Sequence, residues 1–133
     1  MSFLAALLDT LLPGDKMSPT PLPPGSGIGV EARDLPADAL HAVTAEAGGE
    51  AAFETASPEM RADILRRVEA ASPVAFQALL TAVLMRYYQS DAVVTAMGGR
   101  LEPPQPSGRS LPATDAATWA RLEKVRKRGR IWR

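Results

Sequence analysis

The chain has 133 residues, and its 15 basic and 15 acidic side chains give a formal net charge of zero. This length allows one domain with a modest hydrophobic core. Because the chain has no cysteine, disulfides, thiolate metal ligands and a cysteine nucleophile are excluded. No stretch of the sequence reaches the roughly eighteen apolar residues of a membrane helix.

The charges are distributed unevenly. Residues 1–120 carry eight Lys or Arg against fourteen Asp or Glu, a balance of −6, whereas residues 121–133 carry seven against one, a balance of +6. The chain therefore has an acidic body and a basic C-terminal tail.

The first segment predicts a short amphipathic helix that ends at Pro13 and Gly14. Its apolar side chains recur at three- and four-residue steps, at Phe3, Leu4, Leu7, Leu8, Leu11 and Leu12. A helix this short is marginal alone and must pack on other elements. Because its polar edge has no Lys or Arg to meet anionic lipid, we expect it to pack on the core of the protein.

A Pro-rich loop is predicted over about residues 13–35. Prolines stand at Pro19, Pro21, Pro23 and Pro24, and Gly25, Gly27 and Gly29 follow closely. The glycines do not have the G-x-G-x-x-G spacing and no strand precedes them, so we interpret GSGIGV as loop. A loop this long inside a domain is uncommon, and it either contacts a partner or follows the protein surface. Both alternatives stay open.

Three helices are predicted next, over about residues 36–47, 51–55 and 57–71. Phe53 is expected to point inward from the second, and Met60, Ile64, Leu65 and Val68 from the third. Ser57 followed by Pro58 is a typical helix start, because the serine accepts a free backbone N–H and proline has none to lose.

The central element is a helix over residues 72–89, capped by Ser72. One apolar face is predicted from Phe76, Leu79, Leu80, Val83, Leu84, Tyr87 and Tyr88. The two adjacent tyrosines point about 100° apart on a helix, so one is expected in the core and one toward its edge. An exposed tyrosine is a good partner anchor, although both are also compatible with ordinary core-boundary positions. Ser90 and Asp91 begin a further short helix.

A second Pro-rich loop is predicted over about residues 99–113. A last helix then begins at Thr114 or Asp115, and Trp119, Leu122 and Val125 share one of its faces. The pattern thus predicts an all-α protein, with a single domain over 1–133 of five or six short helices joined by two long Pro-rich loops.

The sequence does not predict an active site of its own. His41 is the single histidine, and a metal site would depend on carboxylates, which makes zinc or non-haem iron sites unexpected. The carboxylates of the central helices fall at positions expected to face solvent, and no G-x-S-x-G motif is present. We expect no catalytic, cofactor-binding or metal-binding residue, and no cofactor.

The basic tail, residues 121–133, has two interpretations. Its cations could neutralise phosphates of a nucleic acid, but the acidic body would repel a polyanion. A protein partner is favoured, because the tail also offers Trp132, which can insert into a pocket. The residues predicted to contact a partner are Tyr87, Tyr88, Trp119, Arg126, Arg128, Arg130 and Trp132. Self-association is a further alternative.

These motifs together resemble a known family. LLDTLLPG near the start, F-x-x-L-L-x-x-V-x-x-x-Y-Y over residues 76–88, VVTAMGG after it and the terminal VRKRGRIWR are similar to gluconate 2-dehydrogenase subunit 3. In that family a small, cofactor-free helical protein accompanies a large flavin-dependent sugar or alcohol oxidoreductase.

The resemblance implies a non-catalytic accessory subunit that binds and stabilises or matures such an oxidoreductase. The alternative is a small nucleic-acid- or anion-binding protein that acts through its tail. Exported members begin with a twin-arginine signal, whereas this chain has no arginine before Arg33. We therefore expect a cytoplasmic protein with no membrane partner, and export together with a partner as the alternative.

Overall fold

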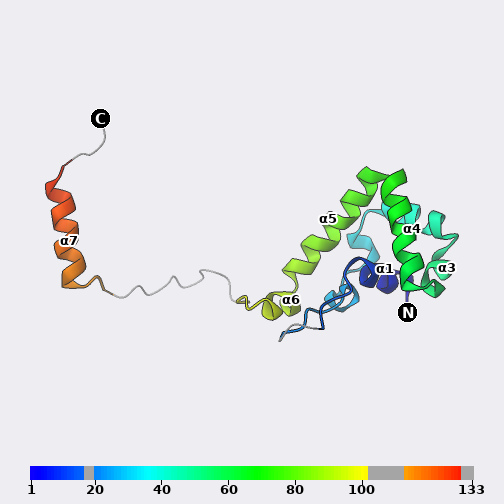
Figure 1. The fold of residues 1–133 in the computed structure, drawn as a ribbon, viewed down its shortest axis with the longest axis horizontal. Helices are drawn as coiled ribbons and strands as arrows, with labels where there is room; N and C mark the ends of the chain where they lie inside the picture. The colour runs from blue at the N-terminus through cyan, green and yellow to red at the C-terminus, as the bar shows by residue number, and fades with distance from the viewer. Residues whose placement is uncertain (17–19, 102–112, 130–133) are drawn as a thin grey trace. The chain divides into compact units, whose positions relative to one another are not determined.

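The computed structural model describes residues 1–16, 20–101 and 113–129. Contacts divide the chain into two units, Met1–Leu101 and Glu102–Arg133, and the expectation of one domain over 1–133 stays a prediction. The all-α class is confirmed, since the described residues form helices and no β-strand (Figure 1). Seven of these are α-helices, because the short pieces α3 and α6 each form a helix of their own. They are α1 (Phe3–Leu11), α2 (Ala37–Ala47), α3 (Glu50–Thr55), α4 (Pro58–Ala71), α5 (Pro73–Gln89), α6 (Asp91–Ala96) and α7 (Ala116–Lys127).

Helix α1 is part of the core of the first unit, as predicted. Ser2 caps it by accepting the Ala5 N–H at 3.3 Å, and Leu7 and Leu8 are buried. The Phe3 ring meets the Phe53 ring of α3 edge to face, with 5.5 Å between centroids. Because these apolar side chains are covered by other elements, α1 is held by tertiary packing rather than by its own propensity.

The first Pro-rich segment has more regular structure than its composition suggested. It contains two 3-10 helices, η1 (Gly25–Ile28) and η2 (Ala32–Asp34). The Gly25 N–H donates to the Leu12 carbonyl at 2.7 Å, and the Ser26 N–H donates to Asp9 Oδ1 at 2.8 Å. These bonds hold η1 directly against the end of α1. The second Pro-rich loop falls almost entirely outside the described residues.

Helices α2, α3 and α4 follow closely along the chain. The core side of α4 consists of Ile64, Leu65 and Val68, as predicted. The prediction for Met60 is wrong, because its side chain is 59% exposed. Arg61 covers α3 at this end of α4 instead. Its guanidinium lies 6.0 Å from the centre of the Phe53 ring and donates to the Phe53 carbonyl at 3.0 Å.

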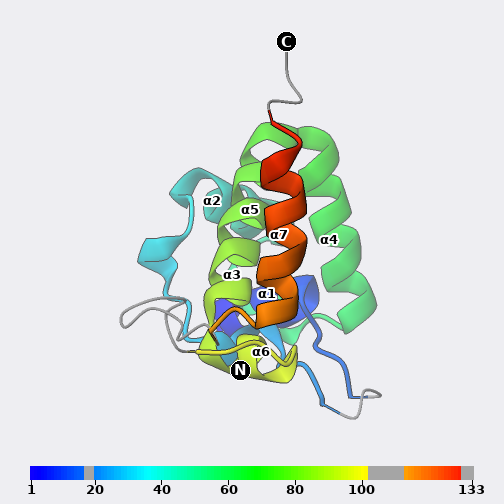
Figure 2. The same cartoon turned by 90° about the vertical axis from the view of Figure 1, so that its left-hand side faces the viewer.

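Helix α5 is the longest helix described, and it packs beside α4 (Figure 2). Its buried residues are Phe76, Leu79, Val83 and Tyr87. Two expectations for this helix are wrong. Ser72 makes no side-chain cap; the same residue also ends α4, where its N–H donates to the Val68 carbonyl. Tyr88 does not share the buried face, because the turn of about 100° from Tyr87 carries it to the outside.

Gly25 provides a test of how tightly η1 and α1 are packed. A Cβ at this position would lie 2.4 Å from the carbonyl oxygen of Leu8, which is backbone and cannot easily move. We therefore expect Gly25→Ala to lower the free energy of unfolding by about 2 kcal/mol, as over-packing usually does. Urea unfolding followed by circular dichroism measures this.

Gly27→Ala is the matched control two residues away. Its Cβ would find its nearest neighbour at 3.5 Å, an ordinary contact with Pro23, so we expect a change below about 0.5 kcal/mol. Equal effects of the two substitutions would contradict the packing of η1 on α1.

Candidate partner-binding surfaces

Tyr87 joins α5 to the Pro-rich segment. Its hydroxyl donates to the Pro23 carbonyl at 2.7 Å, a bond between residues 64 apart in the sequence. The side chain is only 4% exposed, and burial, followed by the neighbouring Tyr88, raises the pKa of Tyr87. Of the two predicted tyrosine anchors, Tyr87 is thus the core residue, and it offers little surface to a partner.

Tyr88 is the tyrosine that faces outward. Its side chain is 55% exposed, and its ring meets the Tyr87 ring edge to face at 5.5 Å. It stands at one end of a row of exposed residues that we call the α5 outer face. The row consists of Val74, Ala78, Thr81, Met85 and Tyr88.

The α5 outer face has the composition of a contact surface. Its members follow steps of four, three, four and three residues, and at about 100° per residue they lie opposite the buried stripe. Arg86 is the only charged residue in the sequence of α5, every residue of which is described, and it pairs with Asp34 at 3.0 Å. Depletion of charge is typical of interface cores. This face was not predicted from the sequence, although its residues recur at helical spacing and could have indicated a second, exposed face of α5.

Helix α7 presents a second exposed surface. Asp115 caps it by accepting the Thr118 N–H at 2.6 Å, and the hydrogen bonds from Thr118 lower the pKa of Asp115. Trp119 is 62% exposed, and Leu122 and Val125, which share its face, are exposed as well. An exposed apolar face of this kind, which no other helix covers among the described residues 113–129, is typical of a helix that binds in a groove of another molecule.

The cations of α7 lie mostly on its other side. Arg121, Lys124 and Lys127, together with Arg128 at its end, are separated from the apolar face by the helical turn. The predicted partner residue Arg126 follows Trp119 by seven residues and therefore lies on the apolar face itself, with its guanidinium 3.7 Å from the Glu123 carboxylate. Arg128 is exposed. Two further predicted residues, Arg130 and Trp132, lie outside the described residues. The structure thus brings Trp119, Arg126 and Arg128 together on one helix.

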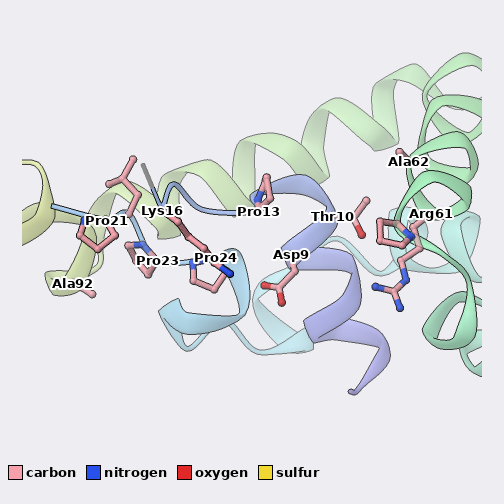
Figure 3. Close-up of a pocket in the computed structure, with 12 residues that line it drawn as sticks. Asp9, Thr10, Pro13, Lys16, Pro21, Pro23, Pro24, Arg61, Ala62 and Ala92 are labelled. Atoms are coloured by element: carbon pink, nitrogen blue, oxygen red, sulfur yellow. The ribbon is translucent and has the colours of Figure 1, made fainter. Parts of the chain in front are cut away.

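A shallow groove of about 790 Å³ lies in the first unit. It is lined by the end of α1, six residues of the Pro-rich segment, the start of α4 and Ala92 of α6 (Figure 3). Three of its polar side chains bind the protein's own backbone: Asp9 accepts from Ser26, Thr10 donates to the Ala6 carbonyl at 2.6 Å, and Arg61 donates to the Glu54 carbonyl at 2.6 Å. Lys16 is the fourth polar side chain of the lining. Apart from Lys16, the groove offers mainly apolar contact.

The described residues do not assemble a metal or catalytic constellation. In the part of the chain that the structure describes, no three His, Asp or Glu side chains group as ligands for a metal ion. His41 is exposed on α2. Among the same residues no helix combines the length and the apolar character needed to cross a membrane. Comparison with known protein families, with characterised proteins and with solved structures found no match to this chain.

Removal of the Tyr87 hydroxyl tests the link to the Pro-rich segment. We expect Tyr87→Phe to lower the free energy of unfolding by about 1–2 kcal/mol, because the Pro23 carbonyl loses its buried donor. Tyr88→Phe is the matched control, and since that side chain is largely exposed we expect a change near zero. Urea unfolding of both variants at pH 7 makes the comparison, and an equal loss would show that the bond to Pro23 contributes nothing.

The raised pKa of Tyr87 predicts a dependence on pH. Above about pH 10 the tyrosine ionises in the unfolded chain but keeps its proton in the folded one, so rising pH favours unfolding. The stability of the wild type should therefore fall relative to Tyr87→Phe as the pH rises above about 10. If the free energies of unfolding of the two proteins changed equally with pH over this range, the burial of the hydroxyl would be contradicted.

Proposed function

We propose that this chain is a non-catalytic accessory subunit that binds and stabilises or matures a larger, flavin-dependent sugar or alcohol oxidoreductase. The resemblance in its sequence motifs to gluconate 2-dehydrogenase subunit 3 supports the class of partner. The single observation that carries the binding role is the exposed apolar face of α7, formed by Trp119, Leu122 and Val125.

The energetics of α7 favour a protein partner. A large aromatic side chain left in water gains roughly 1.5–3 kcal/mol when it is buried, and tryptophan and arginine are the residues most enriched at interface hot spots. Trp119 and Arg126 supply both types on one helix. The cations on the other side of α7 would face solvent or acidic residues of the partner beside its binding groove. Both sides of the helix would then contribute to binding.

The second candidate function is the binding of a nucleic acid or another polyanion. Five cations stand against one acid between residues 121 and 128, and such a cluster can release counterions from phosphates. In this case the cationic side of α7 would make the contact and the apolar face would remain exposed. The two candidates therefore use opposite sides of the same helix, which makes them separable by substitution.

The test is purification of the tagged, full-length protein from its native host. We expect a stoichiometric larger protein that carries flavin absorbance, and we expect Trp119→Ala to weaken its binding about 30-fold, as loss of a 2 kcal/mol hot spot does. Met60→Ala is the control, because it removes an equally exposed apolar side chain of the first unit. Failure to recover a flavoprotein would overturn the proposal.

The same purification separates the second candidate. A bound nucleic acid would be lost steeply as salt rises, and replacement of Arg121 and Lys124 by glutamine would weaken it while Trp119→Ala would not. Capture that is lost with Trp119→Ala but persists in the glutamine variant supports the accessory subunit.

A further inference from the structure

The groove between α1, α4 and the Pro-rich segment, which we call the proline groove, has the size of a ligand site. Its volume of about 790 Å³ lies within the range of small-molecule sites, which are mostly apolar with a few polar groups. Proline rings fix the backbone torsion of the residues that carry them, so the walls need little ordering when a ligand binds. The prolines of the lining are Pro13, Pro21, Pro23, Pro24 and Pro58 (Figure 3).

The main chain of the proline groove favours a small ligand over an extended peptide. Proline has no N–H to donate, and three successive wall residues have carbonyls that already accept hydrogen bonds from within the chain. These carbonyls belong to Leu22, Pro23 and Pro24. Extended peptides that join a partner as an added strand depend on main-chain hydrogen bonds, and this wall has its acceptors in use and no N–H at its prolines.

The charges of the lining select an anion. Asp9 and Arg61 already bond to the backbone of the protein. Within the described residues, Lys16 has no ion pair or hydrogen bond, so its ammonium is available to a ligand. These three charged residues give the lining a balance of +1. Residues 1–101 contain seven Lys or Arg against twelve Asp or Glu, a balance of −5, so the lining has the opposite sign to its unit.

We propose that the proline groove binds a small carboxylate with an apolar body, and that the carboxylate pairs with the Lys16 ammonium. The apolar body lies against the prolines and against Leu22, Ala62 and Ala92 of the lining. The groove exists without the ligand, because the Tyr87 hydroxyl holds Pro23 and the Leu12 carbonyl holds Gly25. This proposal is independent of the function proposed above, which depends on α7.

The openness of the site sets the strength of binding. Lys16 is exposed, so water and salt screen its pairing with the carboxylate, and apolar contact supplies most of the affinity. For a ligand of about a dozen non-hydrogen atoms we expect a dissociation constant of roughly 0.1–1 mM.

Titration of the full-length, isotope-labelled protein with 2-naphthoate, followed by its amide NMR shifts, tests the site. We expect saturable shifts at Ala62 and Ala92, which line the groove, and Lys16→Glu should weaken binding about tenfold because it places a like charge beside the carboxylate. Arg33→Glu is the matched control. It makes the same change in net charge at an exposed cation of η2 that does not line the groove, so the dissociation constant should stay the same. Absence of saturable shifts up to 10 mM, or equal effects of the two variants, overturns the proposal.

A neutral ligand of the same shape tests the role of charge. We expect 2-naphthamide to bind the wild type several-fold more weakly than 2-naphthoate does, and to bind the wild type and Lys16→Glu equally. Equal binding of the amide and the carboxylate to the wild type would show that Lys16 does not select an anion, and would contradict the proposed site.

Discussion

The hydrogen bond between the Tyr87 hydroxyl and the Pro23 carbonyl is the interaction on which the arrangement of the first unit depends most. It connects the end of α5 to the Pro-rich segment, 64 residues earlier in the sequence. The bond gives the half-buried Pro23 a buried donor and holds the segment against α5. In this position of the segment, η1 lies against α1 through the bonds of Gly25 and Asp9. The prolines Pro21, Pro23 and Pro24 then line the groove.

The two sides of α5 differ in what they contact. The inner side, with Phe76, Leu79 and Val83, closes the core against the other helices. The outer side lacks charge and meets solvent. The exposed side of α4 is charged, whereas the exposed row of α5 contains no charged side chain. This contrast between two neighbouring helices is what makes α5 a candidate surface, and a comparable contrast exists on α7 between its apolar and its cationic side.

Much of the fold was predictable because helical periodicity is a local signal. The starts of α4 and α6 followed from Ser57 and Ser90, and the end of α1 from Pro13. The errors arose where the local pattern does not decide. Ser72 has the sequence of a cap, but its side chain makes no cap bond where α4 leads directly into α5. Met60 fits the apolar pattern, but Arg61 bonds to the carbonyls of α3 and takes the covering position.

The candidate surfaces were less predictable than the helices. Trp119 was recognisable as a candidate contact residue, whereas the sequence indicated that Tyr87 and Tyr88 would differ in burial without saying which of them is buried. Tyr87 was not assignable from sequence, because its partner Pro23 lies 64 residues away and no local pattern records such a bond. The α5 outer face was overlooked for a related reason: its residues look like ordinary helix formers until the structure shows which side of the helix is already buried.

The burial of α1 also bears on the order of events during synthesis. Leu7 and Leu8 leave the ribosome well before the helices that pack around them, such as α4. The nascent chain must therefore carry an uncovered leucine-rich helix until the central helices have emerged. Folding of this unit is consequently a late, cooperative event rather than a stepwise one from the N-terminus, and the leucines of α1 are the segment for which a ribosome-associated chaperone would compete.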